Sequence, residues 1–201
     1  MKLYYAPGAC SLAPHIALQE SGLPYDAQRV DLREHKLADG TDYYTINPKG
    51  YVPLLELDSG ERLSEDAVIL QYIADRNPGT LAPAFGSMER YRMMEWLNFI
   101  ATEVHKALNP LWKPTTPDAY KPIVLEAVGK RFDFVVDQLG TKPYLTGERF
   151  TIADAYLFTI VNWHKFLKFG IEQWPALQQY QERVAARPNV QTVLKAEHLL
   201  K

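Results

Sequence analysis

Short apolar runs separated by turn residues make up the first part of the chain. Residues 2–5 are β-prone and end at a Pro-Gly turn, so they predict a short strand. Apolar positions at helical spacing predict a helix over 11–21, with Gly22 as its C-terminal stop. Residues 25–32 predict a second strand. Because a β-α-β unit normally joins two parallel strands, we expect a parallel pair here.

A second group of short elements follows a polar stretch. Residues 52–57 predict a strand, and a tight turn at 58–60 leads into a return strand near Leu63. A helix is expected over 64–76, where apolar residues supply contacts and Ser64 can cap the first turn.

The pattern changes after a connection rich in proline and glycine. From about Ser87 onward the chain has helical character, without strand candidates of comparable quality. We therefore expect an α/β domain over residues 1–80 and an all-helical domain over residues 87–201.

One predicted helix, over 93–108, has two unlike faces. At about 100° per residue, a polar face carries Glu95, Asn98, Thr102 and His105, and an apolar face lies opposite. A solvated face is the usual outcome for such a helix, and a face turned toward a cleft is the alternative.

A capping box near the other end of the chain predicts a buried helix start. Thr151 and Asp154 have the required spacing, and an apolar run follows over 155–161. We interpret this motif as structural.

Composition narrows the classes of function. Lys plus Arg is 22 and Asp plus Glu is 24, a net charge of -2 that argues against dominant binding to nucleic acid or a membrane surface. A single cysteine excludes an intramolecular disulfide and fits a reducing compartment, so we expect a cytoplasmic protein. No secretory signal and no run of roughly 18 apolar residues is found. Cys/His spacing typical of structural zinc is also absent.

Cys10 is the candidate reactive group. It lies between a Pro-Gly turn and a predicted helix start, where unsatisfied N–H groups favour a thiolate, so its pKa should fall. The alternative is a buried, inert cysteine. Ser11 beside it is either a second hydroxyl donor or a helix cap.

Two further features have both structural and functional interpretations. Pro53, at the start of a predicted strand, has two interpretations. It is an ordinary proline of an edge strand, or the Val52–Pro53 bond is cis and the Val52 backbone is free to pair with an extended peptide. From the residues alone, the edge proline is the commoner case. Glu65 and Asp66 open a helix, where acidic residues suit the dipole, and Glu65 could also bind a ligand's ammonium or amide.

Together these motifs resemble the bacterial, beta-class glutathione transferases from one end of the chain to the other. The stretches around Cys10 and His105 are the most specific to that class. The motifs that carry the resemblance are Met1–Tyr5, Pro7–Leu12, Pro14-His15, Asn47–Gly50, Val52-Pro53, Leu63–Glu65, Glu95–Asn98, Thr102–Lys106 and Phe150–Phe158.

The resemblance implies a thioredoxin-like N-terminal domain with a mixed four-stranded sheet, an all-α C-terminal domain, a homodimer and a cis Val52–Pro53 bond. It implies glutathione as co-substrate and no metal. Cys10 and His105 would be catalytic: Cys10 beside the glutathione sulfur, able to form a mixed disulfide with it, and His105 donating to that sulfur region. The implied glutathione-binding residues are Cys10, His35, Lys36, Val52, Glu65, Asp66, Asn98, Thr102, Glu103 and His105.

Within that set, Val52 would pair with the cysteinyl backbone of glutathione. Glu65 and the Asp66 backbone would hold its γ-glutamyl end. The chain departs from the family at two positions: His35, followed by Lys36, stands where a lysine is often found, and Asp66 stands where glycine is common. The first departure leaves open which residue holds the glycyl carboxylate.

The expected function is conjugation of glutathione to small hydrophobic electrophiles, a detoxification chemistry, with glutaredoxin-like exchange through Cys10 as a further option. A binding protein that sequesters hydrophobic ligands without turnover is one alternative, since Trp112 and Trp163 fall near the expected cleft, although a core position is the commoner interpretation of both. A specialised glutathione-dependent dehalogenase or isomerase is another.

Overall fold

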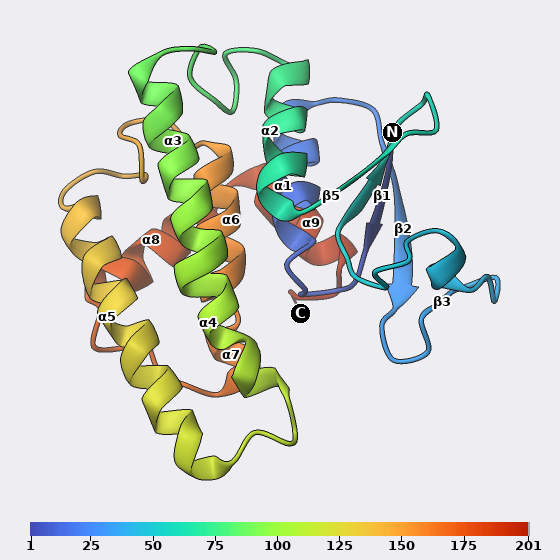
Figure 1. Ribbon diagram of the computed structural model, residues 1–201. Coiled ribbons are helices and arrows are strands. Elements are labelled where there is room, and N and C mark those ends of the chain that lie inside the picture. The colour runs from blue at the N-terminus through green and yellow to red at the C-terminus, as the bar shows by residue number, and fades with distance from the viewer. Residues whose placement is uncertain (201) are drawn as a thin grey trace. The chain divides into compact units, whose positions relative to one another are not determined.

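The computed structural model describes residues 1–200, which form two compact units (Figure 1). The first unit contains residues 1–82 together with 186–200, and the second contains Pro83–Ala185. Residues 186–200 therefore pack with the α/β part of the chain, although the sequence groups them with the helical domain.

A mixed sheet forms the centre of the first unit. Its order is β3-β2-β1-β4-β5, with β1 parallel to β2 and the other neighbours antiparallel. The expected parallel pair is confirmed by the register of Leu3 opposite Ala27. The strands are β1 (Lys2–Tyr5), β2 (Asp26–Asp31), β3 (Lys36–Leu37), β4 (Leu54–Glu56) and β5 (Arg62–Ser64).

The sheet has one strand more than the four expected. The additional strand, β3, is two residues long and pairs with the end of β2 at the sheet's edge. A strand this short shows no alternation of apolar and polar residues, so the sequence pattern cannot indicate it.

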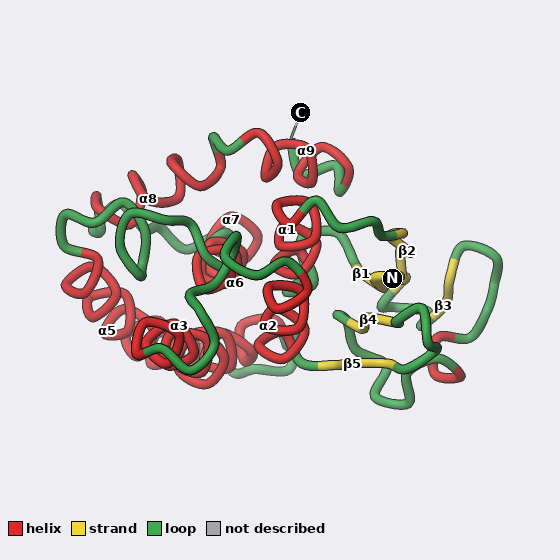
Figure 2. Tube along the Cα trace, turned by 90° about the horizontal axis from the view of Figure 1, so that it is seen from above, coloured by secondary structure: helices red, strands yellow, loops and turns green. Residues whose placement is uncertain are grey.

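Helices α1 (Leu12–Ser21) and α2 (Asp66–Arg76) lie on the same side of this sheet (Figure 2). Most of α1 is buried, and it ends at Gly22 in the left-handed conformation, as the sequence predicts. Ser64 does not cap α2: it is the last residue of β5, and Glu65 occupies the cap position without a side-chain hydrogen bond to the backbone of the helix. The 3₁₀ turn η1 (Tyr43–Thr45) belongs to the same unit.

The last helix, α9 (Pro188–Ala196), packs beside α1 (Figure 1). The guanidinium of Arg187 binds the Glu20 carboxylate through two nitrogens, at 2.6 and 3.0 Å. A paired fork of this kind fixes orientation as well as position, so it ties the end of the chain to the first unit.

The second unit is helical, as predicted, and all named strands of residues 1–200 lie in the first. Its centre is α6 (Ile152–Val161), of which every residue is buried. The expected capping box is present at the start of α6. The remaining elements are α3 (Met88–Phe99), η2 (Ile100–His105), α4 (Lys106–Leu108), η3 (Asn109–Trp112), η4 (Asp118–Tyr120), α5 (Lys121–Leu139), α7 (His164–Leu167) and α8 (Pro175–Ala185).

The segment expected to be one regular helix over 93–108 contains a π-helical turn. The turn, η2, covers Ile100–His105, between α3 and α4. A π turn holds more residues than an α turn, so the 100° spacing that placed Glu95 and His105 on one face does not hold across it. Such turns are frequently found at functional sites.

None of the helices in the described part of the chain is long and apolar enough to cross a bilayer.

Candidate functional site

The loop before α1 is closed by the Ser11 side chain. Its hydroxyl accepts a hydrogen bond from the Ala6 N–H at 3.1 Å and donates to the Ala6 carbonyl at 3.3 Å. Ser11 is fully buried and makes no side-chain cap to α1. Its role is therefore to shape the loop that carries Cys10, and neither of the two roles considered from the sequence applies.

A second support for this loop comes from the end of the chain. The buried Glu197 carboxylate accepts a hydrogen bond from the Gly8 N–H at 2.9 Å and lies 2.7 Å from Nδ1 of His15. No local sequence pattern indicates this contact, because 182 positions separate His15 from Glu197.

The Cys10 thiol is half-buried and donates to the Val52 carbonyl at 3.3 Å. This contact brings together two of the residues that the family resemblance selects. The Val52–Pro53 bond is cis, as the resemblance implies. No hydrogen bond joins the Val52 N–H to another described residue, whereas its carbonyl is occupied by the thiol.

The predicted lowering of the Cys10 pKa is wrong. Burial raises the pKa of the thiol well above its ordinary value, and the neighbouring Asp66 carboxyl raises it further. Backbone N–H groups of Cys10 and Ser11 act in the opposite direction, as expected at a helix start, but their effect is smaller. The position of Cys10 before a predicted helix correctly indicated the nearby backbone N–H groups, but it did not indicate the Asp66 carboxyl.

An exposed ionic cluster borders the start of α2. The Lys49 ammonium lies 2.8 Å from the Glu65 carboxylate and 3.1 Å from the Ser64 hydroxyl. Glu65 has a positive φ of 74°, a conformation rarely adopted by residues other than glycine. Lys49 belongs to the Asn47–Gly50 turn but is not among the predicted site residues; its place just before Val52 is the sequence signal that could have indicated it.

His35 and Lys36 have different surroundings. The His35 ring packs on Tyr44, with centroids 4.5 Å apart, and its Nδ1 is buried without a hydrogen-bond partner among residues 1–200. Lys36 is exposed in β3. The ammonium is thus the more accessible of the two cationic candidates.

The other predicted site residues belong to the second unit. His105, at the end of the π turn, lies 2.8 Å from the Tyr156 hydroxyl through Nδ1. The ring of Trp163 meets the His105 ring edge-on, with centroids 4.9 Å apart. Tyr156 and Trp163 are both buried, so they fix the imidazole in place. No sequence pattern relates Tyr156 to His105, although a buried Tyr hydroxyl normally has a hydrogen-bond partner.

The remaining polar residues of this region are less enclosed. Asn98 and Thr102 are exposed, and the Thr102 hydroxyl donates to the Asn98 carbonyl at 3.0 Å. The Glu103 carboxylate binds Arg131 of α5 at 2.9 Å. Glu103 is therefore already paired within its own unit.

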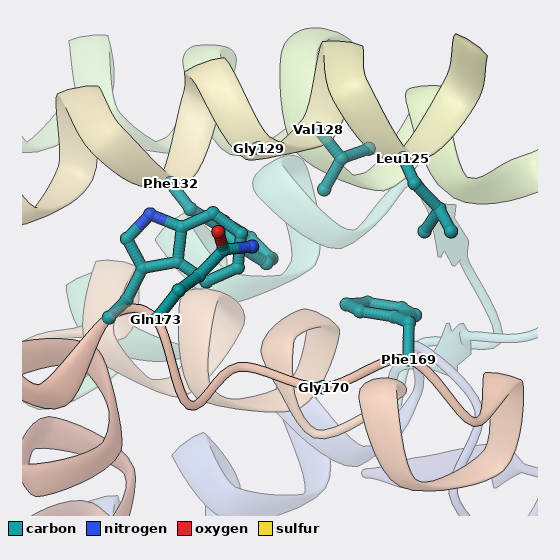
Figure 3. A pocket seen from close by; sticks show the side chains of 8 residues that line it. Leu125, Val128, Gly129, Phe132, Phe169, Gly170 and Gln173 are labelled. Atoms are coloured by element: carbon teal, nitrogen blue, oxygen red, sulfur yellow. The ribbon is translucent and has the colours of Figure 1, made fainter. Parts of the chain in front are cut away.

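A separate hollow lies between α5 and the loop before α8 (Figure 3). Leu125 and Val128 point toward the loop that carries Phe169. The hollow has a volume of about 210 Å³ and no charged side chain in its lining. None of the predicted site residues lines it, so it is distinct from the candidate site.

No group of three or more metal-ligating side chains occurs within residues 1–200.

Comparisons with known proteins agree with these observations. The family described as "Glutathione S-transferase, N-terminal domain" matches residues 8–76, and "Glutathione S-transferase, C-terminal domain" matches residues 99–188. The chain is 47% identical to "Glutathione S-transferase GstA" of Escherichia coli O157:H7, over 99% of this chain and 100% of the relative.

Two solved structures are similar over their whole length. A glutathione S-transferase from Sphingomonas chungbukensis, described as bacterial beta class, is 45% identical with a TM-score of 0.95. A sphingomonad glutathione S-transferase, solved in complex with glutathione, is 45% identical with a TM-score of 0.94. In both comparisons the similarity covers 100% of this chain and 100% of the solved chain.

The chain combines a thioredoxin-like unit, which carries a cysteine just before its first helix, with a helical unit. It belongs to the glutathione S-transferase family. Within that family, the expected resemblance to the bacterial beta class is confirmed.

Proposed function

We propose that this chain conjugates glutathione to small hydrophobic electrophiles, and that Cys10 additionally exchanges disulfides with glutathione. The observation that carries the proposal is the contact of the Cys10 thiol with the Val52 peptide at the start of α1. Glutathione is the co-substrate, as the glutathione-bound relative supports. The single free thiol also supports a cytoplasmic location.

The two domains would divide the work. Residues 1–80 would bind glutathione: the free Val52 N–H would pair with the cysteinyl backbone, and Glu65 with the Asp66 backbone would hold the γ-glutamyl end. Either His35 or Lys36 would hold the glycyl carboxylate, and the exposure of Lys36 favours it. Residues 87–201 would contribute the electrophile site, with Asn98, Thr102, Glu103 and His105 as its polar residues.

His105 is the proposed donor to the glutathione sulfur. Its Nδ1 lies 2.8 Å from the hydroxyl of the buried Tyr156, a contact that fixes the orientation of the imidazole. A donor aimed at a developing or resting anion lowers the energy of that anion, so His105 would increase the fraction of ionised glutathione.

Steady-state conjugation of glutathione with a chloronitrobenzene tests the function. We expect turnover that saturates with glutathione and falls about tenfold in His105→Gln, the equivalent of one hydrogen bond to a charged group. His164→Gln is the matched control, since this half-buried histidine of the same unit contacts Phe169 and lies outside the proposed site.

The opposite outcome favours the binding-protein alternative. Saturable uptake of a hydrophobic dye, unaffected by glutathione and without conjugation of any tested electrophile, would contradict the proposed function. Reductive removal of chloride from a chlorinated aromatic, or isomerisation of an unsaturated diketo acid, without conjugation of the chloronitrobenzene, would instead favour the specialised dehalogenase or isomerase.

A homodimer completes the proposal, and an exposed apolar side of α3 supports it. Met88, Tyr91 and Met94 recur every three residues in α3, with exposed fractions of 63%, 54% and 36%, and Phe85, which is 89% exposed, lies just before the helix. Monomeric proteins rarely leave large contiguous apolar patches uncovered, so we propose a second copy of the chain as the occupant.

A charged residue on this apolar side of α3 should dissociate the proposed homodimer. Tyr91→Glu is expected to change the mass measured by light scattering from that of two chains to that of one, because an unpaired carboxylate is costly to bury. Ile123→Glu is the control: Ile123 is equally exposed, at 58%, but lies at the start of α5. Dissociation in the control alone would place the interface elsewhere.

A further inference from the structure

We propose that Tyr43 and Asn47 are positioning residues for glutathione, because they hold the Tyr51–Val52 peptide in the orientation that presents its N–H to the ligand. This inference deepens the proposed function and rests on it for the identity of the ligand. One of its two tests uses the free protein, so the inference and the proposed function can fail separately.

The Tyr51 carbonyl accepts two side-chain hydrogen bonds. The Tyr43 hydroxyl and the Asn47 amide each donate to it at 2.8 Å. Both donors are buried, with exposed fractions of 0% and 4%, whereas Tyr51 itself is 67% exposed. Two buried side chains therefore converge on the carbonyl of an exposed residue, and they fix the direction in which that carbonyl points.

The N–H of the same peptide belongs to Val52, and it has no hydrogen-bond partner among the described residues. The Tyr51–Val52 bond is trans. In a trans peptide the C=O and the N–H point in opposite directions, so a fixed carbonyl also fixes the direction of the N–H. Val52 is only 7% exposed, and an unpaired N–H at such a residue costs free energy unless water or a ligand accepts from it. The geometry therefore favours a ligand that supplies an acceptor.

The two donors are fixed by contacts of their own. The Tyr43 ring packs on Tyr4, with centroids 5.7 Å apart, in the same hydrophobic cluster as Val52. The Tyr43 carbonyl accepts a hydrogen bond from the Asn47 N–H at 2.8 Å. Because both side chains are already ordered, binding of an extended peptide to the Val52 N–H loses little conformational entropy.

The Tyr43 hydroxyl remains a donor at any pH near neutrality. Burial raises the pKa of Tyr43 to about 12, so the hydroxyl keeps its proton far above the pH of the assay. The effect of removing this hydroxyl should therefore be the same on both sides of pH 7.

Steady-state conjugation separates positioning from a purely structural role. Tyr43→Phe preserves the ring and removes one donor to the Tyr51 carbonyl. We expect the KM for glutathione to rise about fivefold, the equivalent of one neutral hydrogen bond. The kcat and the KM for the chloronitrobenzene should change by less than about twofold, because the lost interaction binds the ground state and the transition state equally.

Two further variants complete this test. Asn47→Ala removes the other donor to the same carbonyl, and we expect the same rise in the KM for glutathione. It also carries the test if Tyr43→Phe fails to fold. Tyr25→Phe is the matched control: this half-buried tyrosine of the same unit donates to the Gln19 side chain at 3.1 Å, so its kinetic constants should match those of the parent.

The amide spectrum of the isotope-labelled free protein gives a test that needs no activity. We expect a sharp Val52 signal in the parent and in Tyr25→Phe. In Tyr43→Phe and Asn47→Ala the signal should broaden, because the peptide plane can then exchange between orientations. This broadening would support the positioning role even if the parent conjugated no electrophile, the result that would contradict the proposed function alone.

Two results would overturn the inference. The first is an unchanged KM for glutathione in Tyr43→Phe and Asn47→Ala, together with a Val52 signal as sharp as in the parent. The second is a lower kcat with an unchanged KM for glutathione in both variants, which would show damage to the fold or to the reacting groups instead of a loss of binding.

Discussion

Replacing Asp154 with alanine is expected to lower the free energy of unfolding by about 3–5 kcal/mol, the typical loss when a buried polar network loses its central member. The Asp154 carboxylate accepts hydrogen bonds from the backbone N–H and hydroxyl of Thr151, at 2.8 and 2.9 Å. It also accepts from the Leu145 N–H at 2.9 Å and the Tyr180 hydroxyl at 3.1 Å. Alanine would leave the buried donors of Thr151 and Leu145 without this acceptor, and the Tyr180 hydroxyl would keep only the carbonyl of residue 154, at 3.3 Å.

Urea unfolding followed by circular dichroism measures this loss. Asp154→Asn should lie between alanine and the parent, because one oxygen remains to accept hydrogen bonds. Asp118→Ala is the control: that carboxylate pairs with Lys121 on the surface and is 94% exposed, so its removal should leave the transition unchanged within error. An Asp154→Ala protein as stable as the parent would show that the network is replaceable by water.

Local sequence patterns were sufficient to predict most of the strands and helices of the fold. The short strands of the first unit and the helices of the second unit follow from hydrophobic spacing and turn residues, which act within a few positions of the chain. The capping box at Thr151 and Asp154 is equally local, so its geometry was predictable. The strand β3 and the π turn were missed, because neither has a periodicity of its own in the sequence.

The candidate site was predictable only in part. Motifs located Cys10 and Val52, and the family resemblance, not their spacing, related them across 42 positions. The partners that orient site residues come from distant segments: Glu197 supports the Cys10 loop, and Tyr156 faces His105. Such pairs depend on tertiary packing, which no local pattern encodes.

The Cys10 pKa shows the same limit. A helix start favours the thiolate, and the backbone N–H groups of Cys10 and Ser11 do act to lower the Cys10 pKa. Burial and the Asp66 carboxyl outweigh it. Both effects come from chain segments packed around the sulfur, so the sign of the shift could not be found from the residues next to Cys10.

The Cys10→Ser protein is expected to lose disulfide exchange completely. In the parent, the Cys10 thiolate attacks one sulfur of oxidised glutathione; a Cys10–glutathione disulfide forms, and the other glutathione leaves as a thiolate that takes up a proton. A second glutathione must then release Cys10, since the chain has no other cysteine. Mass spectrometry after incubation with oxidised glutathione should show one reductant-sensitive adduct on the parent and none on the variant.

Conjugation should persist in the same variant, because the attacking sulfur there is that of glutathione. The raised pKa of Cys10 strengthens this expectation: near neutral pH the residue is a thiol, which is a poor nucleophile and carries no charge to repel the glutathione thiolate. The adduct on the parent should therefore form about ten times faster for each pH unit gained below the pKa of the Cys10 thiol. Loss of conjugation together with exchange in both Cys10→Ser and Cys10→Ala would instead make Cys10 part of the transferase chemistry itself.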